Sequence, residues 1–259
     1  MHAVPPHSLR RALLLGSAGL LLAPGAGSVL AQGGGLRLQG FTENLPPLNY
    51  EEGGQARGFS VELARLICAE AGLSLDVQVM PWVRAMQSAA QQPASLLFSL
   101  TRTPERESQF QWVGPISPRR VMVYRLSRRQ DLQPASLKEL KNLRIGVVRD
   151  SAAARLLQAE GLGEDQLELG LDDATNLRKL LVGRMDLIVL LDWAAAWHLH
   201  QHRLPMRTLT PVLPLDTSRS YWFGLPPDTD PALIRRLQDA LDRLRRDGRY
   251  ELLRRKYLE

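Results

Sequence analysis

A group of residues suited to anion binding follows one apolar segment of the chain. The run SLLFSL, residues 95–100, has the composition of a buried parallel strand. It carries Ser99 and, just past its end, Thr101, and the turn RTPER then places Arg106 near the same sheet edge. A guanidinium offers two parallel donors to the two oxygens of a carboxylate, which a lysine cannot match. The pattern alone also fits a solvated loop charge, and Arg102 in the same loop competes with Arg106.

A second feature of this kind is predicted at the turn Arg149-Asp150-Ser151-Ala152-Ala153. Asp150 or Ser151 can cap the helix predicted over residues 151–160, and the free N–H groups at a helix start attract anions. A plain helix cap explains the same two side chains. In that case only the backbone N–H groups would contact an anion.

Other chemistry finds little support in the sequence. A single cysteine, Cys68, excludes an internal disulfide and a cysteine-rich metal site, and we expect it to be buried and inert. His198 and His202 share one helix face, but no third ligand or HExxH motif accompanies them, so a solvated helix end is the favoured interpretation. We therefore expect no metal and no cofactor.

The charge of the chain is modest for its 259 residues, with a formal net charge of +6. Basic runs occur at Arg119–Arg120, at Arg128–Arg129 and along the two helices predicted at the C-terminus. They stand among nearby acids and are interpreted as solvated faces. This charge favours attraction to small anions and is far from that of a nucleic-acid-binding arm.

Short apolar runs alternate with helical patterns along the chain. Strands are predicted at residues 36–41, 73–80, 95–100, 110–113, 121–126, 143–148, 166–171, 186–191, 206–213 and 219–225. Helices are predicted at 59–72, 82–91, 151–160, 174–182, 193–202, 232–246 and 249–258. The alternation indicates α/β architecture with parallel sheets covered on both faces. A polar, basic linker at 127–134 divides the series and predicts two α/β lobes.

The N-terminus has the features of an export signal. Arg10 and Arg11 precede an apolar stretch over 12–23, and small residues end at a cleavage site near Ala31. The apolar stretch is shorter than a bilayer span, so a membrane anchor is the less favoured alternative. We expect residues 1–31 to be a signal peptide and the mature protein to reach the periplasm.

Five fragments of the chain resemble one known family. They are ARGFSVELARLI (56–67), LTRTPERE (100–107), SLKELKNLRIGVV (136–148), GRMDLIVLLD (183–192) and LRRDGRYELLRRKYLE (244–259). In this order they resemble the bacterial extracellular solute-binding proteins of family 3, the periplasmic receptors of polar amino-acid ABC transporters. The resemblance implies a two-lobed periplasmic-binding-protein fold of type II, in which each lobe is a mostly parallel sheet flanked by helices. Lobe one would be 32–122 plus 222–259, lobe two 123–221, and the hinge strands would lie near 120–125 and 219–224.

The resemblance also assigns roles to the residues of the two candidate features. Arg106 would form a two-pronged pair with a ligand carboxylate, assisted by Ser99 and Thr101. The turn at Asp150 and Ser151 would bind the same carboxylate from lobe two.

Further site residues follow from the resemblance with alternatives beside them. Asp192 would pair with a ligand ammonium group. It lies one position later than the usual spacing from Asp186, and a one-residue slip within a strand turns a side chain to the other face. If Asp192 does not have this role, a carboxylate-bearing or otherwise polar ligand that is not an amino acid is expected. Trp82 would face the cleft, or else the core, and Tyr50 would help to line the cleft together with Leu45. The two tryptophans of lobe two, Trp193 and Trp197, are predicted to be core residues.

The expected function is capture of a small amino acid or organic acid by a monomer whose lobes close on a hinge, followed by delivery to an inner-membrane ABC permease. One alternative is a cleft enzyme of the cyclohexadienyl dehydratase type, for which Glu43 and Asp150 are the candidate acid and base. Another is a sensor or binding protein without a transporter. Sensor-kinase relatives carry a membrane span and a kinase region, whereas this sequence ends at Glu259.

Overall fold

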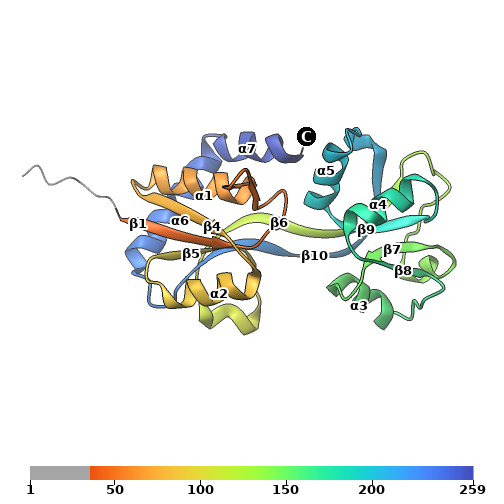
Figure 1. Cartoon of the computed structure of the whole chain (residues 1–259), viewed down its shortest axis with the longest axis horizontal. Coiled ribbons are helices and arrows are strands. Elements are labelled where there is room, and N and C mark those ends of the chain that lie inside the picture. The colour runs from red at the N-terminus through yellow and green to blue at the C-terminus, as the bar shows by residue number, and fades with distance from the viewer. Residues whose placement is uncertain (1–35, 259) are drawn as a thin grey trace, which may run out of the picture. The chain divides into compact units, whose positions relative to one another are not determined.

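The structure is a computed structural model that describes residues 36–258 (Figure 1). The predicted signal peptide, 1–31, lies outside the described residues. Within the described part of the chain, no helix combines the length and the apolar character that a membrane crossing requires.

One eight-stranded sheet has the order β4-β1-β5-β10-β6-β9-β7-β8. Its strands are β1 (Arg37–Thr42), β4 (Ser74–Val79), β5 (Ser95–Thr101), β6 (Gln111–Leu126), β7 (Ile145–Val148), β8 (Leu167–Gly170), β9 (Leu187–Leu191) and β10 (Leu209–Leu225). The strands β4, β1 and β5 are parallel, as are β8, β7 and β9, while β6 and β10 run antiparallel to their neighbours between these two groups. A separate hairpin pairs β2 (Tyr50–Glu52) with β3 (Gln55–Arg57).

Helices connect the strands and cover both faces of the sheet (Figure 1). They are α1 (Phe59–Glu70), α2 (Trp82–Gln91), α3 (Ala152–Ala159), α4 (Asp173–Leu181), α5 (Asp192–Gln201), α6 (Pro231–Arg246) and α7 (Arg249–Leu258). Short 3₁₀ turns lie at η1 (Pro104–Gln109), η2 (Leu137–Asn142) and η3 (Met206–Thr208). Every α-helix begins and ends within two residues of its predicted bounds, so the α/β prediction is confirmed.

The two central strands are longer than the sequence predicted. Most of 110–113 and all of 121–126 belong to the single strand β6, and most of 206–213 joins 219–225 in β10. Prolines and charged residues between these segments break the apolar pattern. The paired strands accommodate them at four register shifts, two of which follow Pro211 and Pro214.

The core consists of four buried apolar clusters, two against each parallel group of strands. Around β1 and β5, one cluster packs α1, α6 and α7 and another packs α2. Around β7 and β9, one packs α3 and another packs α4 and α5. In β9, Leu187 and Val189 belong to the cluster that packs α3, whereas Ile188 and Leu190 belong to the cluster that packs α4 and α5. Side chains that alternate between two clusters in this way are typical of a strand buried on both faces.

A bulge interrupts β5 where the sequence predicts site residues. Leu97 and Leu100 lie in one cluster although they are three residues apart, and Ser99 between them has a φ of 53°. On β10, Gly224 pairs with Leu97 and Trp222 with Leu100, so three steps on β5 match two on β10. Such a bulge re-aims the chain that leaves the strand. It therefore sets the direction of the η1 turn.

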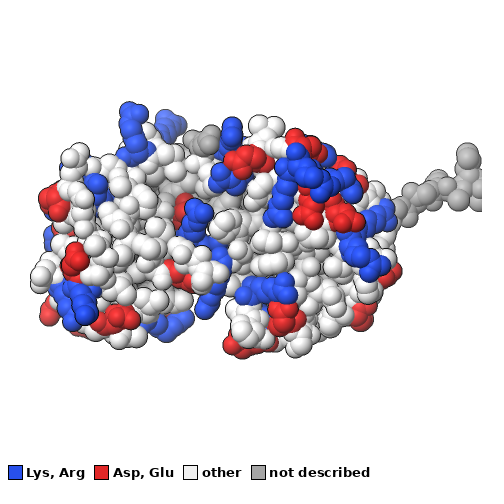
Figure 2. Space-filling model, turned by 180° about the vertical axis from the view of Figure 1, so that it is seen from behind, with Lys and Arg blue, Asp and Glu red and all other residues white. Residues whose placement is uncertain are grey.

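The arginine-rich C-terminal helices form ion pairs with nearby acids. Arg243 and Arg249 both reach Glu70, at 3.0 and 2.9 Å, and Lys256 contacts Glu62 at 2.7 Å. Figure 2 shows basic and acidic side chains side by side over one face of the molecule. These pairs agree with the interpretation of the basic runs on α6 and α7 as solvated faces.

Helix α5 joins two of the core clusters. Its Trp193 is 2% exposed, lies 4.7 Å from the ring of Phe59, and donates from Nε1 to Ser117 Oγ at 2.8 Å. The prediction that Trp193 belongs to the core is confirmed. Trp197, one turn later, is only half-buried and contacts the ring of Tyr50 at 5.0 Å.

We predict that Trp193→Ala lowers the free energy of unfolding by about 3–5 kcal/mol, because a large buried aromatic side chain is lost and a cavity remains. Trp197→Ala is the matched control on the same helix, and it should cost less than half as much. Urea unfolding of both variants measures the difference. Equal losses would contradict the role assigned to Trp193.

Candidate functional site

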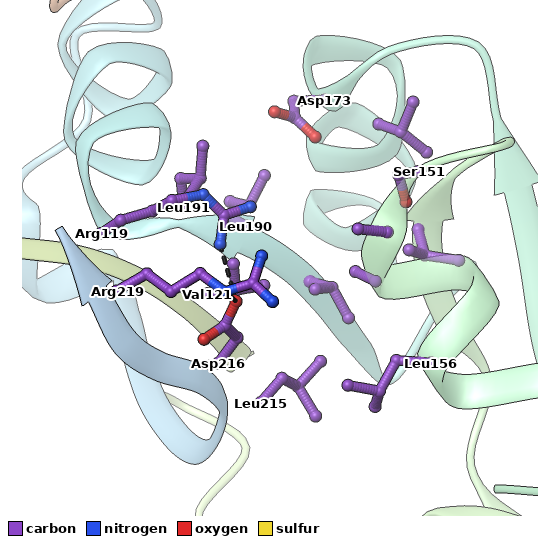
Figure 3. Close-up of a pocket in the computed structure, with 15 residues that line it drawn as sticks. Arg119, Val121, Ser151, Leu156, Asp173, Leu190, Leu191, Leu215, Asp216 and Arg219 are labelled. Carbon is purple, nitrogen blue, oxygen red and sulfur yellow. Dashed lines mark hydrogen bonds and ion pairs between the residues drawn. The ribbon is translucent and has the colours of Figure 1, made fainter. Parts of the chain in front are cut away.

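A cavity of about 580 Å³ lies between the central strands β6 and β10 and the first turns of α3 and α4 (Figure 3). Its walls are largely apolar, with a few polar and charged groups, as in small-molecule sites. The lining residues are Arg119, Val121, Val147, Val148, Ser151, Ala152, Ala153, Leu156, Asp173, Val189, Leu190, Leu191, Leu215, Asp216 and Arg219.

Strand pairing brings three charged groups to one side of this cavity. Arg119 on β6 is directly opposite Arg219 on β10, so the two side chains share a face. Asp216 bridges them, with its carboxylate 2.9 Å from Arg119 Nη1 and 3.9 Å from Arg219 Nε. Arg119 is 19% exposed, so the interpretation of the run Arg119–Arg120 as a solvated face was wrong for its first residue. Because a single carboxylate serves two guanidiniums, this side carries an excess positive charge.

The opposite wall includes the start of α3. Ser151 caps this helix as predicted, and its Oγ accepts a hydrogen bond from the N–H of Ala154 at 3.0 Å. Ser151 lines the cavity, whereas the neighbouring Asp150 is exposed and does not. Asp150 has a φ of 57°, and its carbonyl oxygen accepts from Arg155 Nη1 at 2.5 Å. Of the two residues predicted to bind the ligand from lobe two, only Ser151 therefore lines the cavity.

A carboxylate at the start of α4 also faces this cavity. Asp172 caps the helix by accepting from the N–H of Thr175 at 2.6 Å, which leaves Asp173 in the first turn. Burial raises the pKa of Asp173 from 3.8 to about 6, and the adjacent charge of Asp172 adds to the shift. Asp173 was not among the site residues predicted from the sequence. Its only signal was an Asp-Asp pair at a helix start, which a cap explains equally well.

A second cavity of about 330 Å³ adjoins the first, because both are lined by Val148, Asp173 and Leu191. Its other walls are mostly apolar and come from the segment before β2 and from the starts of α4 and α5. They are Leu45, Pro46, Leu48, Leu171, Asp172, Ala174, Trp193, Ala194 and His198. Asp173 thus lies where the two cavities meet.

Of the predicted lobe-one residues, Leu45 lines the second cavity, whereas the group around Arg106 lies outside both cavities. Ser99 Oγ donates to Asn49 Oδ1 at 2.5 Å and shares a hydrogen bond with Ser60 Oγ at 2.9 Å, since the β5 bulge turns it into this buried network. Arg106 Nη1 donates to the carbonyl oxygen of Thr101 at 3.3 Å, and its guanidinium carbon lies 5.8 Å from the centre of the Trp82 ring. The structure therefore brings Thr101, Arg106 and Trp82 together.

The competing arginine of the same loop has its own partners. Arg102 Nε donates to Glu107 at 2.7 Å, and its guanidinium lies over the rings of Trp112 and Trp222. Arg106 has no such carboxylate partner among the described residues.

Asp192 and Tyr50 both contact tryptophans of α5. Asp192 Oδ1 accepts from the N–H of Trp193 at 2.9 Å, and burial raises its pKa; it lines neither of the two cavities. Tyr50 packs against Trp197.

The two residues considered as acid and base, Glu43 and Asp150, do not lie in one cavity. Glu43 lines a third cavity together with Trp82, whereas Asp150 is exposed. Within residues 36–258, no group of three or more His, Cys, Asp or Glu side chains can hold a metal ion.

The paired parallel groups joined by two long antiparallel strands are the architecture of the periplasmic-binding-protein class. The chain belongs to the bacterial extracellular solute-binding proteins, family 3, whose model matches residues 39–259. The predicted family and fold are confirmed.

The named relatives are a binding protein and an enzyme. The arginine-binding extracellular protein ArtP of Bacillus subtilis (strain 168) is 30% identical over 111 residues, 42% of each chain. Membrane-bound lytic murein transglycosylase F of Ectopseudomonas mendocina (strain ymp) is 25% identical over 276 residues, covering 99% of this chain and 54% of the relative. The matches thus cover about half the length of these curated relatives.

Among solved structures, the second substrate-binding domain of Lactococcus lactis GlnP in its open conformation superposes with a TM-score of 0.72. It is 19% identical, and the match covers 86% of this chain and 95% of that one. At this identity the likeness concerns the fold alone.

We predict that the carboxyl group of Asp173 titrates near pH 6 in the ligand-free protein. The groups around it are Asp172 on its own helix, His198 on α5, and the trio Arg119, Arg219 and Asp216 across the cavity. A pKa raised by folding stabilises the folded protein below pH 4, and this stabilisation is lost as the pH rises through 6. Carbon-detected NMR of the carboxyl group measures the midpoint, and Asp173→Asn identifies the signal. A midpoint near 4 would contradict the burial of this group.

Proposed function

We propose that this protein captures a small carboxylate-bearing solute, in the first place a polar amino acid, and delivers it to an ABC permease. The observation that carries the proposal is the 580 Å³ cavity, in which an excess positive charge on β6 and β10 faces the start of α3. Its size and mostly apolar walls suit one small organic molecule. Membership of a solute-binding family supports the same conclusion.

A ligand carboxylate can meet two kinds of donor in this cavity. The first N–H groups of a helix have no partner within the helix, and those that follow Ser151 lie in the wall. On the other side, Arg219 is 54% exposed and shares Asp216 with Arg119, so its guanidinium can turn toward a ligand.

Arg106 is proposed to complete the anion site from the η1 turn. The pKa of Glu105 is lowered by a hydrogen bond from Thr103 and, to a smaller extent, by the charges of Arg219 and Arg106. Arg219 therefore acts on the same turn that carries Arg106. Thr101 holds Arg106 through its carbonyl oxygen, and Trp82 supports the guanidinium from its ring face.

Lobe movement about β6 and β10 is proposed to trap the solute. The solute would first contact Arg106 and Thr101, and closure would add Ser151 and the start of α3, so the closed state is stabilised by these extra contacts. We place this function in the periplasm, with the protein acting as a monomer and without a cofactor.

Binding without turnover is favoured over the dehydratase alternative. That alternative needs an acid and a base in one site, whereas Glu43 lines the third cavity and Asp150 is exposed. Turnover of prephenate or arogenate by the purified protein would establish the enzyme instead.

A thermal-shift screen of amino acids, organic acids and small amines tests the proposed function, because a ligand that binds the native state raises the melting temperature. We expect carboxylate-bearing compounds to raise it and simple amines to leave it unchanged. A panel in which no carboxylate raises the melting temperature would contradict the proposal.

We predict that Arg106→Ala weakens binding of the selected carboxylate at least tenfold with the fold retained, since a hydrogen bond between charged groups contributes about 1.5–3 kcal/mol. Calorimetry measures the change. Arg102→Ala is the matched control in the same loop and should alter affinity less than twofold. Unchanged affinity in Arg106→Ala removes this residue from the site.

A further inference from the structure

Asp173 is a carboxylate without a partner at the junction of the two cavities. No hydrogen bond or ion pair reaches its side chain from the other residues in the range 36–258. Other cavity groups are bound: Asp216 by Arg119, and Ser151 by the N–H of Ala154. A half-buried carboxylate that lacks a cation is unfavourable unless something else neutralises it.

The charges of the first cavity are arranged in two separated parts. Arg119, Arg219 and Asp216 come from β6 and β10 and together carry one excess positive charge. Asp173 at the start of α4 and Ser151 at the start of α3 lie on the other side of the cavity (Figure 3). A ligand with one anionic and one cationic group would match both parts.

We infer that Asp173, rather than Asp192, is the residue that binds the ammonium group of the solute. This inference rests on the proposed function, in which the solute is in the first place an amino acid, and adds the residue that recognises its second charge. The carboxylate of the solute would lie toward Arg219 and the start of α3, its ammonium toward Asp173, and its remaining atoms along the apolar walls. Ammonium groups donate up to three hydrogen bonds, which suits a carboxylate with both oxygens free.

Asp192, the residue that the sequence favoured for this role, is less suited to it. Its Oδ1 already accepts from the N–H of Trp193, and it lines neither cavity. Arg120 and Arg254 act on its charge, whereas Asp173 is influenced only by burial and by Asp172. Asp173 therefore has both carboxylate oxygens available to a ligand, whereas Asp192 already uses one of its oxygens.

The test is calorimetry with matched pairs of probes that differ only in the ammonium group: L-leucine with 4-methylpentanoate, and L-glutamine with glutaramate. We expect the wild-type protein to bind the amino acid of at least one pair at least tenfold more tightly than its deamino partner. Asp173→Asn keeps the shape of the side chain and should remove that preference, with the deamino acid bound as before. Thermal unfolding verifies that the variant is folded.

Asp172→Asn is the matched control, because it removes a charge one residue away while asparagine still caps the helix. It should keep the preference for the amino acid. Equal binding of both members of each pair by the wild-type protein, or a preference that persists in Asp173→Asn, overturns this inference alone. A selective loss in Asp192→Asn would transfer the role to that residue. Absence of binding to all four probes overturns this inference, and if no carboxylate in the thermal-shift screen raises the melting temperature either, the proposed function is overturned as well.

Discussion

The pairing of β6 with β10 is the constraint on which the rest of the structure depends. These two strands fix the register that places Arg119 opposite Arg219, with Asp216 close enough to hold both. They also lie between the two groups of parallel strands, so the charged face they form is the place where groups from both sides can meet. Two like charges directly opposite each other are unfavourable. Asp216 reduces the repulsion between Arg119 and Arg219, but its single negative charge leaves one excess positive charge on this face.

Helix starts supply the other half of the site. In this family architecture the strands β7 and β8 lead into α3 and α4, so the first turns of both helices reach the same cavity. The two turns are used differently. At α3 the cap is Ser151, an uncharged group that accepts from the N–H of Ala154 and leaves the first backbone N–H groups of the helix open to an anion. At α4 the cap is Asp172, and the next residue, Asp173, presents a carboxylate instead.

Local patterns were sufficient to predict most of the fold. The helical spacing of apolar residues located every α-helix, and the alternation of helices with apolar runs indicated the α/β class. The same signals predicted Ser151 as a cap and Trp193 as a core residue, because both depend on nearest neighbours along the chain or on one helix face.

What the sequence did not reveal depends on pairing between distant segments. Arg119 belongs to a basic run, and only its register against β10 shows that it faces a cavity. Ser99 lies in an apolar strand, and only the bulge against β10 turns it toward Asn49 and Ser60. Asp173 is one of two adjacent acids at a helix start, and nothing in its local pattern distinguishes the cap from the residue that faces the cavity.

A crystal structure of the protein grown with the solute chosen by the thermal-shift screen tests the central claim most directly. We expect the solute inside the cavity between β10 and the start of α3, with its carboxylate within hydrogen-bond distance of an arginine. A solute bound only in the third cavity, beside Glu43 and Trp82, would contradict it.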